Sequence, residues 1–493
     1  MGISETNIVV IGAGIGGLAA GALLASEGAS VTVLEAQLHA GGCAATFSRK
    51  GYRFEAGATV GCGFHAGGPM QELGRELGIV WPVEALPVAW QYRHDALCLD
   101  LVRSKADLLK RFPHSRDFWN EQEELSRLLW KLASGGLSWP PASLGDLGKL
   151  LRKGVSGLPG TARLLRFATK TAYDWLAAHR LDADQEFVRF IDAQLLISVQ
   201  TTSRHASAVN AAIALDLPSS GAWRVHGGIG SIAELLAANI ERNGGAVLYR
   251  KQVVRIDSIR RQIIGVETAD GNAYAADMVL ADLTPASLSL LVDSFDAATI
   301  LRSKGPLPEW SAFMLYLGMD AGAVSSTGAG HLQITGSSGN LGEGNSIFVS
   351  CSSPHETDRA PEGLLAVTVS THTRPQPWFA ALEQSGDEYT QRKKAYAERV
   401  LDLMATQLPG VREAIRFIES ATPVTWQRFT GRHRGFVGGY PQTSLFDVRD
   451  PSTGFDNMFL VGDSVFPGQS LPGVVTGARR AVELVRRVKR GNA

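Results

Sequence analysis

The apolar and polar positions of the first 35 residues follow the order strand, helix, strand. An apolar run of strand length covers Asn7–Ile11 and breaks into a glycine-rich turn over residues 12–17. Small apolar residues at helical spacing continue to Glu27, and Ser30–Leu34 has the composition of a second strand. This pattern predicts a βαβ unit whose two strands are parallel.

The turn inside this unit has the spacing of a dinucleotide-binding loop. Gly12 permits a tight turn, Gly14 lets the backbone approach a pyrophosphate, and Gly17 allows the helix to pack closely on the sheet. Glu35 ends the second strand, where its carboxylate can accept a hydrogen bond from a ribose 2′-hydroxyl and would repel a 2′-phosphate. Because strand, turn, helix and acid are in register, the sequence predicts dinucleotide binding rather than a chance glycine-rich turn.

The middle of the chain changes from strand alternation to helical spacing and back. Six of the ten tryptophans fall between Trp81 and Trp175, and residues 85–220 are predicted to form an apolar helical region. Ser231 and Glu234 have the spacing of a capping box that opens a helix over residues 232–243. Residues 322–344 are rich in glycine and serine and are expected to form loops. Further strands are expected at 247–249, 253–256, 263–267 and 273–276, the last two as a hairpin, and a further helix at 389–408.

The C-terminal segment adds a second contact region for the same ligand. A buried-strand run over residues 458–461 ends in Gly462-Asp463, which places a carboxylate at the edge of a sheet where ligands of such folds bind. A helix is predicted to begin at Leu471, and its free N–H groups suit a flavin carbonyl that becomes anionic on reduction. Two distant segments converging on one dinucleotide predict FAD rather than NAD. The alternative is that Asp463 only caps this helix.

Composition and charge exclude several classes of partner. Lys plus Arg equal Asp plus Glu at 48 each, so no global field attracts nucleic acid, and no nucleic-acid partner is expected. The four cysteines lack the spacing of metal ligands, so no metal site is predicted, and they fit reduced thiols in a cytoplasmic protein. Residues 8–25 are apolar enough to resemble a signal or membrane segment, but they contain five glycines in the phosphate-turn arrangement. No membrane-spanning run is expected.

Four segments carry a resemblance to a known family: residues 41–47, 429–432, 435–442 and 461–475. Together with the phosphate turn they resemble the FAD-dependent amine oxidase and phytoene desaturase superfamily over nearly the whole chain. Within it they are similar to carotenoid desaturases and isomerases, and the pattern around residues 112–119 is most similar to the carotenoid 3′,4′-desaturases. Cys43 stands where many members have Arg, which favours the branch that holds terminal desaturases, polyene isomerases and retinol saturases.

The resemblance implies an α/β fold with a glutathione-reductase-like FAD-binding Rossmann domain and a discontinuous mixed α+β substrate domain. The FAD-binding domain is expected over 1–84, 225–289 and 420–493, and the substrate domain over 85–224 and 290–419. Val253 matches a backbone position that meets the adenine, although it is equally compatible with an ordinary strand valine. The FAD contacts that the family implies are Gly12, Gly14, Gly17, Glu35, Gly41, Gly42, Val253, Asp463, Gly473 and Val474.

The activity implied is desaturation of a long apolar polyene such as a carotenoid, by hydride transfer to flavin, with oxygen or a quinone as electron acceptor. Isomerisation or saturation of a similar substrate is the first alternative. A prenyl-binding escort protein of the same fold is another, against which the intact phosphate turn, Glu35 and Gly462-Asp463 argue, and an amine oxidase is a further alternative. No catalytic base is assigned, because the sequence favours structural or surface roles for His65 and for the cluster Arg432, His433 and Arg434.

A lipid substrate implies contact with a membrane surface, and residues 147–170 have the composition for it. Leucines and other apolar residues alternate there with six cations, and no acidic residue lies between Asp146 and Asp174. The cations are Lys149, Arg152, Lys153, Arg163, Arg166 and Lys170. The sequence therefore predicts a cytoplasmic protein that is peripherally attached to a membrane; the alternative is a solvated face of the helical region.

Overall fold

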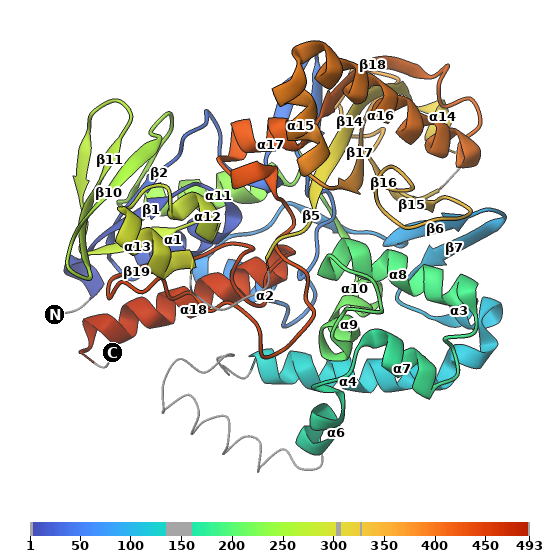
Figure 1. Ribbon diagram of the computed structural model, residues 1–493, viewed down its shortest axis with the longest axis horizontal. Helices are drawn as coiled ribbons and strands as arrows, with labels where there is room; N and C mark the ends of the chain where they lie inside the picture. The colour runs from blue at the N-terminus through green and yellow to red at the C-terminus, as the bar shows by residue number, and fades with distance from the viewer. Residues whose placement is uncertain (1–2, 135–159, 302–306, 326–327, 492–493) are drawn as a thin grey trace.

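A five-stranded parallel sheet forms one half of the molecule in the computed structural model, which describes residues 3–134, 160–301, 307–325 and 328–491 (Figure 1). The strand order is β19 (Met458–Leu460), β13 (Met278–Ala281), β1 (Asn7–Ile11), β2 (Ser30–Leu34) and β9 (Ala246–Leu248). The strands come from three distant parts of the chain, and every pair is parallel. Their near-continuous apolar composition fits a sheet that is covered on both faces.

Helices cover one face of this sheet and a smaller sheet covers the other. The helices are α1 (Ile15–Ser26), α11 (Gly230–Arg242) and α18 (Leu471–Lys489), which share one apolar core with the sheet. The other face packs on the antiparallel sheet of β10 (Val253–Ile259), β11 (Gln262–Thr268) and β12 (Ala273–Ala275), which includes the predicted hairpin. A Cβ on Gly16 of α1 would lie 2.6 Å from the backbone nitrogen of Gly462, so small residues allow this close packing.

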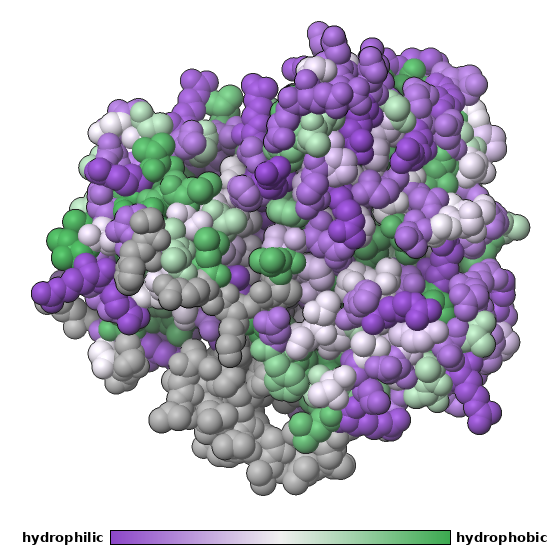
Figure 2. All heavy atoms as spheres, in the orientation of Figure 1, coloured by the Kyte–Doolittle hydropathy of each residue, from purple (hydrophilic) through white to green (hydrophobic). Residues whose placement is uncertain are grey.

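A seven-stranded sheet forms the other half of the molecule (Figure 1). Its order is β18 (Ile415–Ala421), β14 (Ser311–Asp320), β17 (Leu364–Thr373), β16 (Ser346–Cys351), β15 (His331–Thr335), β6 (Trp90–His94) and β7 (Leu97–Leu101), with only β15 and β6 parallel. Helices α15 (Gln376–Gln384) and α16 (Gly386–Gln407) cover one face. Figure 2 shows mostly hydrophilic side chains over these two helices, so their outer surface faces solvent.

Two parts of this sheet correct the sequence prediction. Residues 322–344 were expected to form loops, but they contain the short helix α14 (Gly322–Ser325) and the strand β15, all five of whose residues are buried. Strands β6 and β7 lie within the stretch that was predicted to be helical. In both places, pairing with neighbouring strands decides the conformation of a short segment whose own composition is ambiguous.

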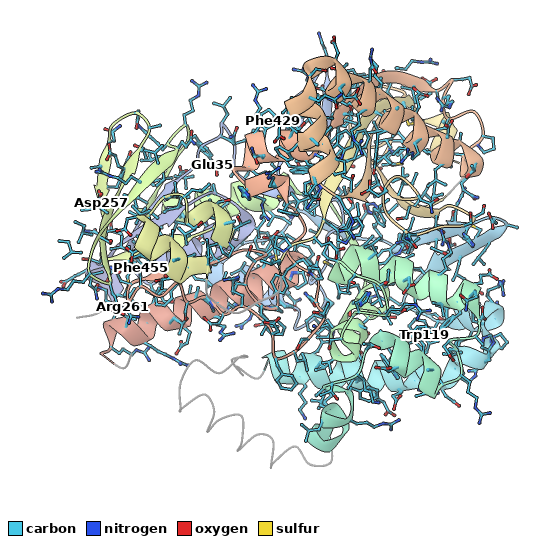
Figure 3. All side chains as sticks on the ribbon, viewed as in Figure 1. Glu35, Trp119, Asp257, Arg261, Phe429 and Phe455 are labelled. Carbon is cyan, nitrogen blue, oxygen red and sulfur yellow. The ribbon has the colours of Figure 1, made fainter. Side chains whose placement is uncertain are left out.

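The remaining described part of 85–220, residues 106–134 and 160–220, is mainly helical, as its spacing predicts. It comprises α3 (Ala106–Arg111), α4 (Arg116–Ser134), α6 (Gly160–Phe167), α7 (Ala172–Ala178), α8 (Gln185–Val199), α9 (Ala208–Ala214) and α10 (Leu217–Ser220). An aromatic core holds these helices together: the ring centroids of Phe118 and Trp175 are 4.5 Å apart, and Trp119 (Figure 3) packs against Phe118. Among the described residues, no helix is long and apolar enough to cross a membrane.

Short elements connect these layers. They are α2 (Pro69–Leu77), α12 (Pro285–Leu288), α13 (Ser294–Leu301), α17 (Pro423–Thr430), β3 (Thr46–Arg49), β4 (Tyr52–Glu55), β5 (Val83–Ala85) and β8 (Trp223–Val225), with the 3-10 turns η1 (Ile3–Glu5), η2 (Gly42–Ala44), η3 (Pro113–Ser115) and η4 (His433–Gly435). The capping box expected at Ser231 is wrong: α11 begins at Gly230, and the Ser231 hydroxyl donates to the carbonyl of His226 at 3.1 Å.

Candidate functional site: a cavity between the two sheets

One large cavity of about 1290 Å³ extends from the carboxyl edge of the parallel sheet to the seven-stranded sheet and the helical region. Gly14, Glu35 and Asp463 line one end, and Trp90 and Phe348 line the other. Ligand pockets for a single small molecule have volumes of about 300–1,000 Å³. The cavity is therefore large enough for an extended ligand or for two ligands together.

The phosphate turn forms one wall as the sequence predicts. Gly12 has a φ of +93°, and its N–H donates to the carbonyl of Leu34 at 2.8 Å. Gly14 lies on the cavity surface, where a Cβ would come within 2.3 Å of the Asp282 Oδ2 atom. Gly17 lies behind this surface, and a Cβ there would be 2.7 Å from the carbonyl oxygen of Gly12, so its role is packing. The start of α1 therefore faces the cavity with a glycine surface that suits an anion.

Glu35 is oriented by the backbone around it. Its two carboxylate oxygens accept hydrogen bonds of 2.7 Å from the N–H groups of Ala13 and Gln37. It lies at the end of β2 on the cavity wall, and Phe429 lines the same cavity from α17 (Figure 3). Val253 also lines the cavity at the start of β10, two residues after Lys251, whose N–H donates to the carbonyl of Glu35.

The second glycine turn touches the first. Gly41 has a φ of +116° and its N–H donates to the carbonyl of Ala13 at 2.8 Å, so the two turns form adjacent parts of one surface. A Cβ on Gly41 would lie 2.6 Å from the Cα of Ala45, and one on Gly42 would lie 3.6 Å from the Cα of Gly14. The conformation of this turn therefore requires that Gly41 carries no side chain.

The C-terminal segment completes the wall. Asp463 and Val474 line the cavity, whereas Gly473 lies beside it with its N–H directed at the Ser470 hydroxyl. Ser470 is the N-cap of α18, so Asp463 does not cap this helix. Eight of the ten predicted FAD contacts are thus on the cavity wall, and Gly17 and Gly473 are just behind it. Their contact with the cofactor stays a prediction.

Two charged residues at this wall were not assigned from the sequence. Asp282 follows β13 and accepts a hydrogen bond of 3.0 Å from the N–H of Gly17, and burial raises the pKa of its carboxyl to about 6. Arg432 donates to Asp463 at 2.9 Å, and its side chain is only 17% exposed. The signal for Asp282 is similar to that for Asp463, since Asp282 directly follows β13 and Asp463 lies three residues after the end of β19. The signal for Arg432 was weaker, because its partner is 31 positions away.

The other candidates for a catalytic base lie elsewhere. The His65 ring packs between Trp130 and Trp223, with centroids 6.2 Å from each, and burial lowers its pKa. Arg434 lies over the ring of Phe379 at 5.3 Å. His65, His433 and Arg434 are not among the residues that line the cavity.

The far half of the cavity is mainly apolar and aromatic. Trp90 and Phe348 meet with ring centroids 6.1 Å apart at an interplanar angle of 69°, and Ile197 and Leu217 from the helical region lie on the same wall. His372 lines the cavity as well, and burial lowers its pKa to about 4, so it is neutral near pH 7. Such a surface excludes water and favours an apolar ligand.

A glycine-lined turn, an acid at the end of β2 and a helix N-terminus that face one large cavity are the features of a dinucleotide-binding enzyme. The chain belongs to the family of flavin containing amine oxidoreductases, which matches residues 15–486. Its cofactor is FAD. The residues present fit this group, because the glycine turns at Gly14 and Gly42 leave backbone without side chains on the cavity wall, near the Glu35 carboxylate.

Relatives and solved structures agree with this assignment. The chain is 28% identical to prolycopene isomerase 1, chloroplastic, of an Oncidium hybrid cultivar, over 98% of this chain and 84% of that protein. It is 24% identical to the lycopene-forming phytoene desaturase of a Paracoccus species, over 97% of this chain and 96% of that protein. The cyclohexylamine oxidase of Brevibacterium oxydans IH-35A has the same fold, with a TM-score of 0.61 at 17% identity over 99% and 100% of the two chains. The resemblance to carotenoid desaturases and isomerases is confirmed.

Proposed function

We propose that this oxidoreductase acts on a long apolar polyene of the carotenoid kind and desaturates it. The observation that carries the proposal is the continuity of one cavity of about 1290 Å³ from the phosphate turn at Gly14 to the aromatic wall at Trp90 and Phe348. A polyene in the aromatic half would have one end beside the flavin, which is the position that oxidation of an allylic carbon requires.

In this proposal FAD supplies the redox step by accepting a hydride, while a neighbouring proton leaves to a base or to water. The protein's own residues bind and orient the two molecules. The glycine turns and Glu35 hold the dinucleotide, and the apolar wall positions the polyene and keeps water away. Oxygen or a quinone would then accept the electrons. The 3′,4′ bond at the end of an acyclic carotenoid is the finer assignment that we propose.

Isomerisation is the second candidate. It is favoured by the 28% identity to prolycopene isomerase 1, which extends over 98% of this chain and exceeds the 24% identity to the phytoene desaturase. An isomerase of this fold would change the geometry of a double bond without a net loss of hydrogen. The two candidates therefore differ in the mass of the product.

Expression in a host that accumulates lycopene or another acyclic carotenoid tests both candidates. Desaturation lowers the mass of the pigment by two hydrogens and shifts its absorption to longer wavelength. An unchanged mass with altered double-bond geometry would favour isomerisation, and a gain of two hydrogens would favour saturation. The Gly14→Val variant, which should not retain FAD, is the matched control. Unchanged pigment with an FAD-loaded chain would count against a carotenoid substrate.

We also propose that the protein docks reversibly on a membrane surface, because a carotenoid dissolves only in lipid. The segment concerned is 147–170, of which 147–159 lies outside the described residues. In the described part, Leu165 on α6 is 69% exposed and is followed by Arg166, which lies 3.9 Å from Glu121. An exposed apolar residue beside a cation supports surface insertion.

A further inference from the structure

Three polar side chains form a chain of hydrogen bonds from the core of the seven-stranded sheet to the cavity. His331 on β15 and Ser350 on β16 are cross-strand partners, and the His331 Nδ1 atom lies 2.9 Å from the Ser350 Oγ atom. The Ser350 hydroxyl in turn donates to the Thr59 Oγ1 atom at 2.8 Å. His331 and Ser350 are 6% and 5% exposed, whereas Thr59 lines the cavity.

The number of protons available determines which atom donates in each of these hydrogen bonds. Ser350 has one hydroxyl proton and gives it to Thr59, so the bond between Ser350 and His331 requires a proton on Nδ1 of the imidazole. Burial lowers the pKa of His331 to about 4, with Arg224 acting in the same direction, so the ring is neutral near pH 7. The Thr59 oxygen accepts from Ser350, so the hydroxyl proton of Thr59 can be donated to an acceptor in the cavity. Among the described residues, no such acceptor is seen.

Thr59 lies on the part of the wall that connects the two predicted FAD contact regions. The preceding residue, Ala58, donates its N–H to the carbonyl of Cys43 at 3.0 Å, directly after the second glycine turn. Further along the same loop, a Cβ on Gly63 would be 3.0 Å from Pro472 in the first turn of α18. The loop therefore runs from the phosphate half of the site to the helix N-terminus, and Thr59 lies between them.

We propose that Thr59, oriented by Ser350 and His331, is a positioning residue that donates a hydrogen bond to the ring system of the bound flavin. Reduction places extra electron density on those rings, so a fixed donor stabilises the reduced cofactor more than the oxidised one. Because Ser350 already donates to Thr59, the Thr59 hydroxyl does not donate back to Ser350, and its proton is available to the flavin. This inference depends on FAD binding but not on the identity of the polyene.

The midpoint potential of FAD bound to the purified full-length protein tests the inference. Thr59→Val removes the donor with little change in shape, and Ser350→Ala removes the group that orients it. We expect both variants to lower the ratio of reduced to oxidised flavin about tenfold at a given potential, which for a two-electron couple is about 30 mV. Thr59→Ser keeps the hydroxyl and should retain the potential of the parent protein.

Ser346→Ala is the matched control. Ser346 lies on the same strand, four residues before Ser350, and its buried hydroxyl accepts from the N–H of Gly342 without joining the chain. Its substitution should leave the potential unchanged. Thr59→Ala replaces Thr59→Val if the latter does not retain FAD. The inference is overturned if Thr59→Val, or Thr59→Ala in its place, has the midpoint potential of the parent protein. It is also overturned if this variant shifts the potential while Ser350→Ala does not. Failure to convert a carotenoid would bear on the proposed substrate but not on this potential.

Discussion

The carboxylate of Asp282 lies against the phosphate turn, where its Oδ2 atom accepts a hydrogen bond of 3.0 Å from the N–H of Gly17. The same oxygen atom is 2.3 Å from the position that a Cβ on Gly14 would occupy. Asp282 therefore stabilises the first turn of α1 and also limits which residues the turn can contain. The pKa of the Asp282 carboxyl is also influenced by three other charged groups, of which two are acidic: Arg432, Asp463 and Glu35.

The first prediction concerns the pH dependence of stability. Burial raises the pKa of Asp282 from 3.8 to about 6, so the folded protein binds this proton more tightly than the unfolded chain does. The contribution of this carboxyl to the free energy of unfolding is fully present below pH 4 and is lost as the pH rises through 6. The total loss is about 3 kcal/mol. Asp282→Asn keeps an acceptor for Gly17 and does not titrate.

Urea unfolding of the FAD-free protein and of its Asp282→Asn variant, at pH 4.5 and at pH 7.5, measures this difference. The variant should gain stability relative to the parent protein at the higher pH. A difference between the two proteins that is the same at both pH values would contradict the prediction.

The second prediction concerns Gly14. Gly14→Ala adds a Cβ that meets Asp282 and also occupies the surface on which the pyrophosphate is expected, so FAD affinity should fall at least about tenfold. Gly386→Ala is the matched control, because a Cβ there meets nothing within 4 Å. The double variant Gly14→Ala/Asp282→Ala should recover stability of the FAD-free protein without recovering FAD binding. FAD titration followed by flavin fluorescence gives the affinity; normal affinity in Gly14→Ala would refute this role.

The third prediction concerns the ion pair between Arg432 and Asp463, whose side chains are 17% and 13% exposed. Arg432→Met leaves the Asp463 carboxylate without its partner in a mostly buried position, which should cost about 3 kcal/mol of stability. Adding Asp463→Asn removes the unpaired charge, so the double variant should be more stable than Arg432→Met alone. Chemical denaturation of the three proteins tests this order. If the double variant is the least stable, the pair does not behave as a buried ion pair.

The fourth prediction concerns the membrane. Each cation near an anionic bilayer contributes about 1 kcal/mol, so replacing Lys149, Arg152, Lys153 and Arg163 by Gln should weaken binding to anionic liposomes by about 30-fold if half of them face the lipid. Binding should also weaken as salt rises. The control replaces Arg250, Arg255, Arg260 and Arg261, which belong to the region of β10 and β11, away from α6 in Figure 1. Binding of both variants to the liposomes is measured by sedimentation. An equal loss of binding in the two would mean that binding depends only on net charge and not on this segment.

Much of the FAD-binding half could be predicted from the sequence because its signals are local. Asn7–Ile11 and Ser30–Leu34 have the predicted bounds, and α18 begins at Leu471 as expected. In each case apolar composition and an adjacent glycine turn indicate the same element. Glu35 and Asp463 line the cavity as predicted, because each acid follows a strand of the parallel sheet and such acids lie at one edge of it.

What could not be predicted depends on residues that are distant in the chain. His331–Thr335 forms a strand because β16 and β6 pair with it on both sides, although the segment is short and lies in a stretch rich in glycine and serine. The capping box at Ser231 failed because the hydroxyl donates to the carbonyl of His226 instead. The bond between Thr59 and Ser350 joins residues 291 positions apart, and the sequence has no signal for it.

The origin of the parallel sheet in three chain segments has a consequence for biosynthesis. The edge strand Met458–Leu460 must pair with Met278–Ala281, which leaves the ribosome much earlier. Contacts across such distances form slowly. The parallel sheet is therefore incomplete until residue 460 has been synthesised, and a truncation before residue 458 would remove its edge strand together with Asp463.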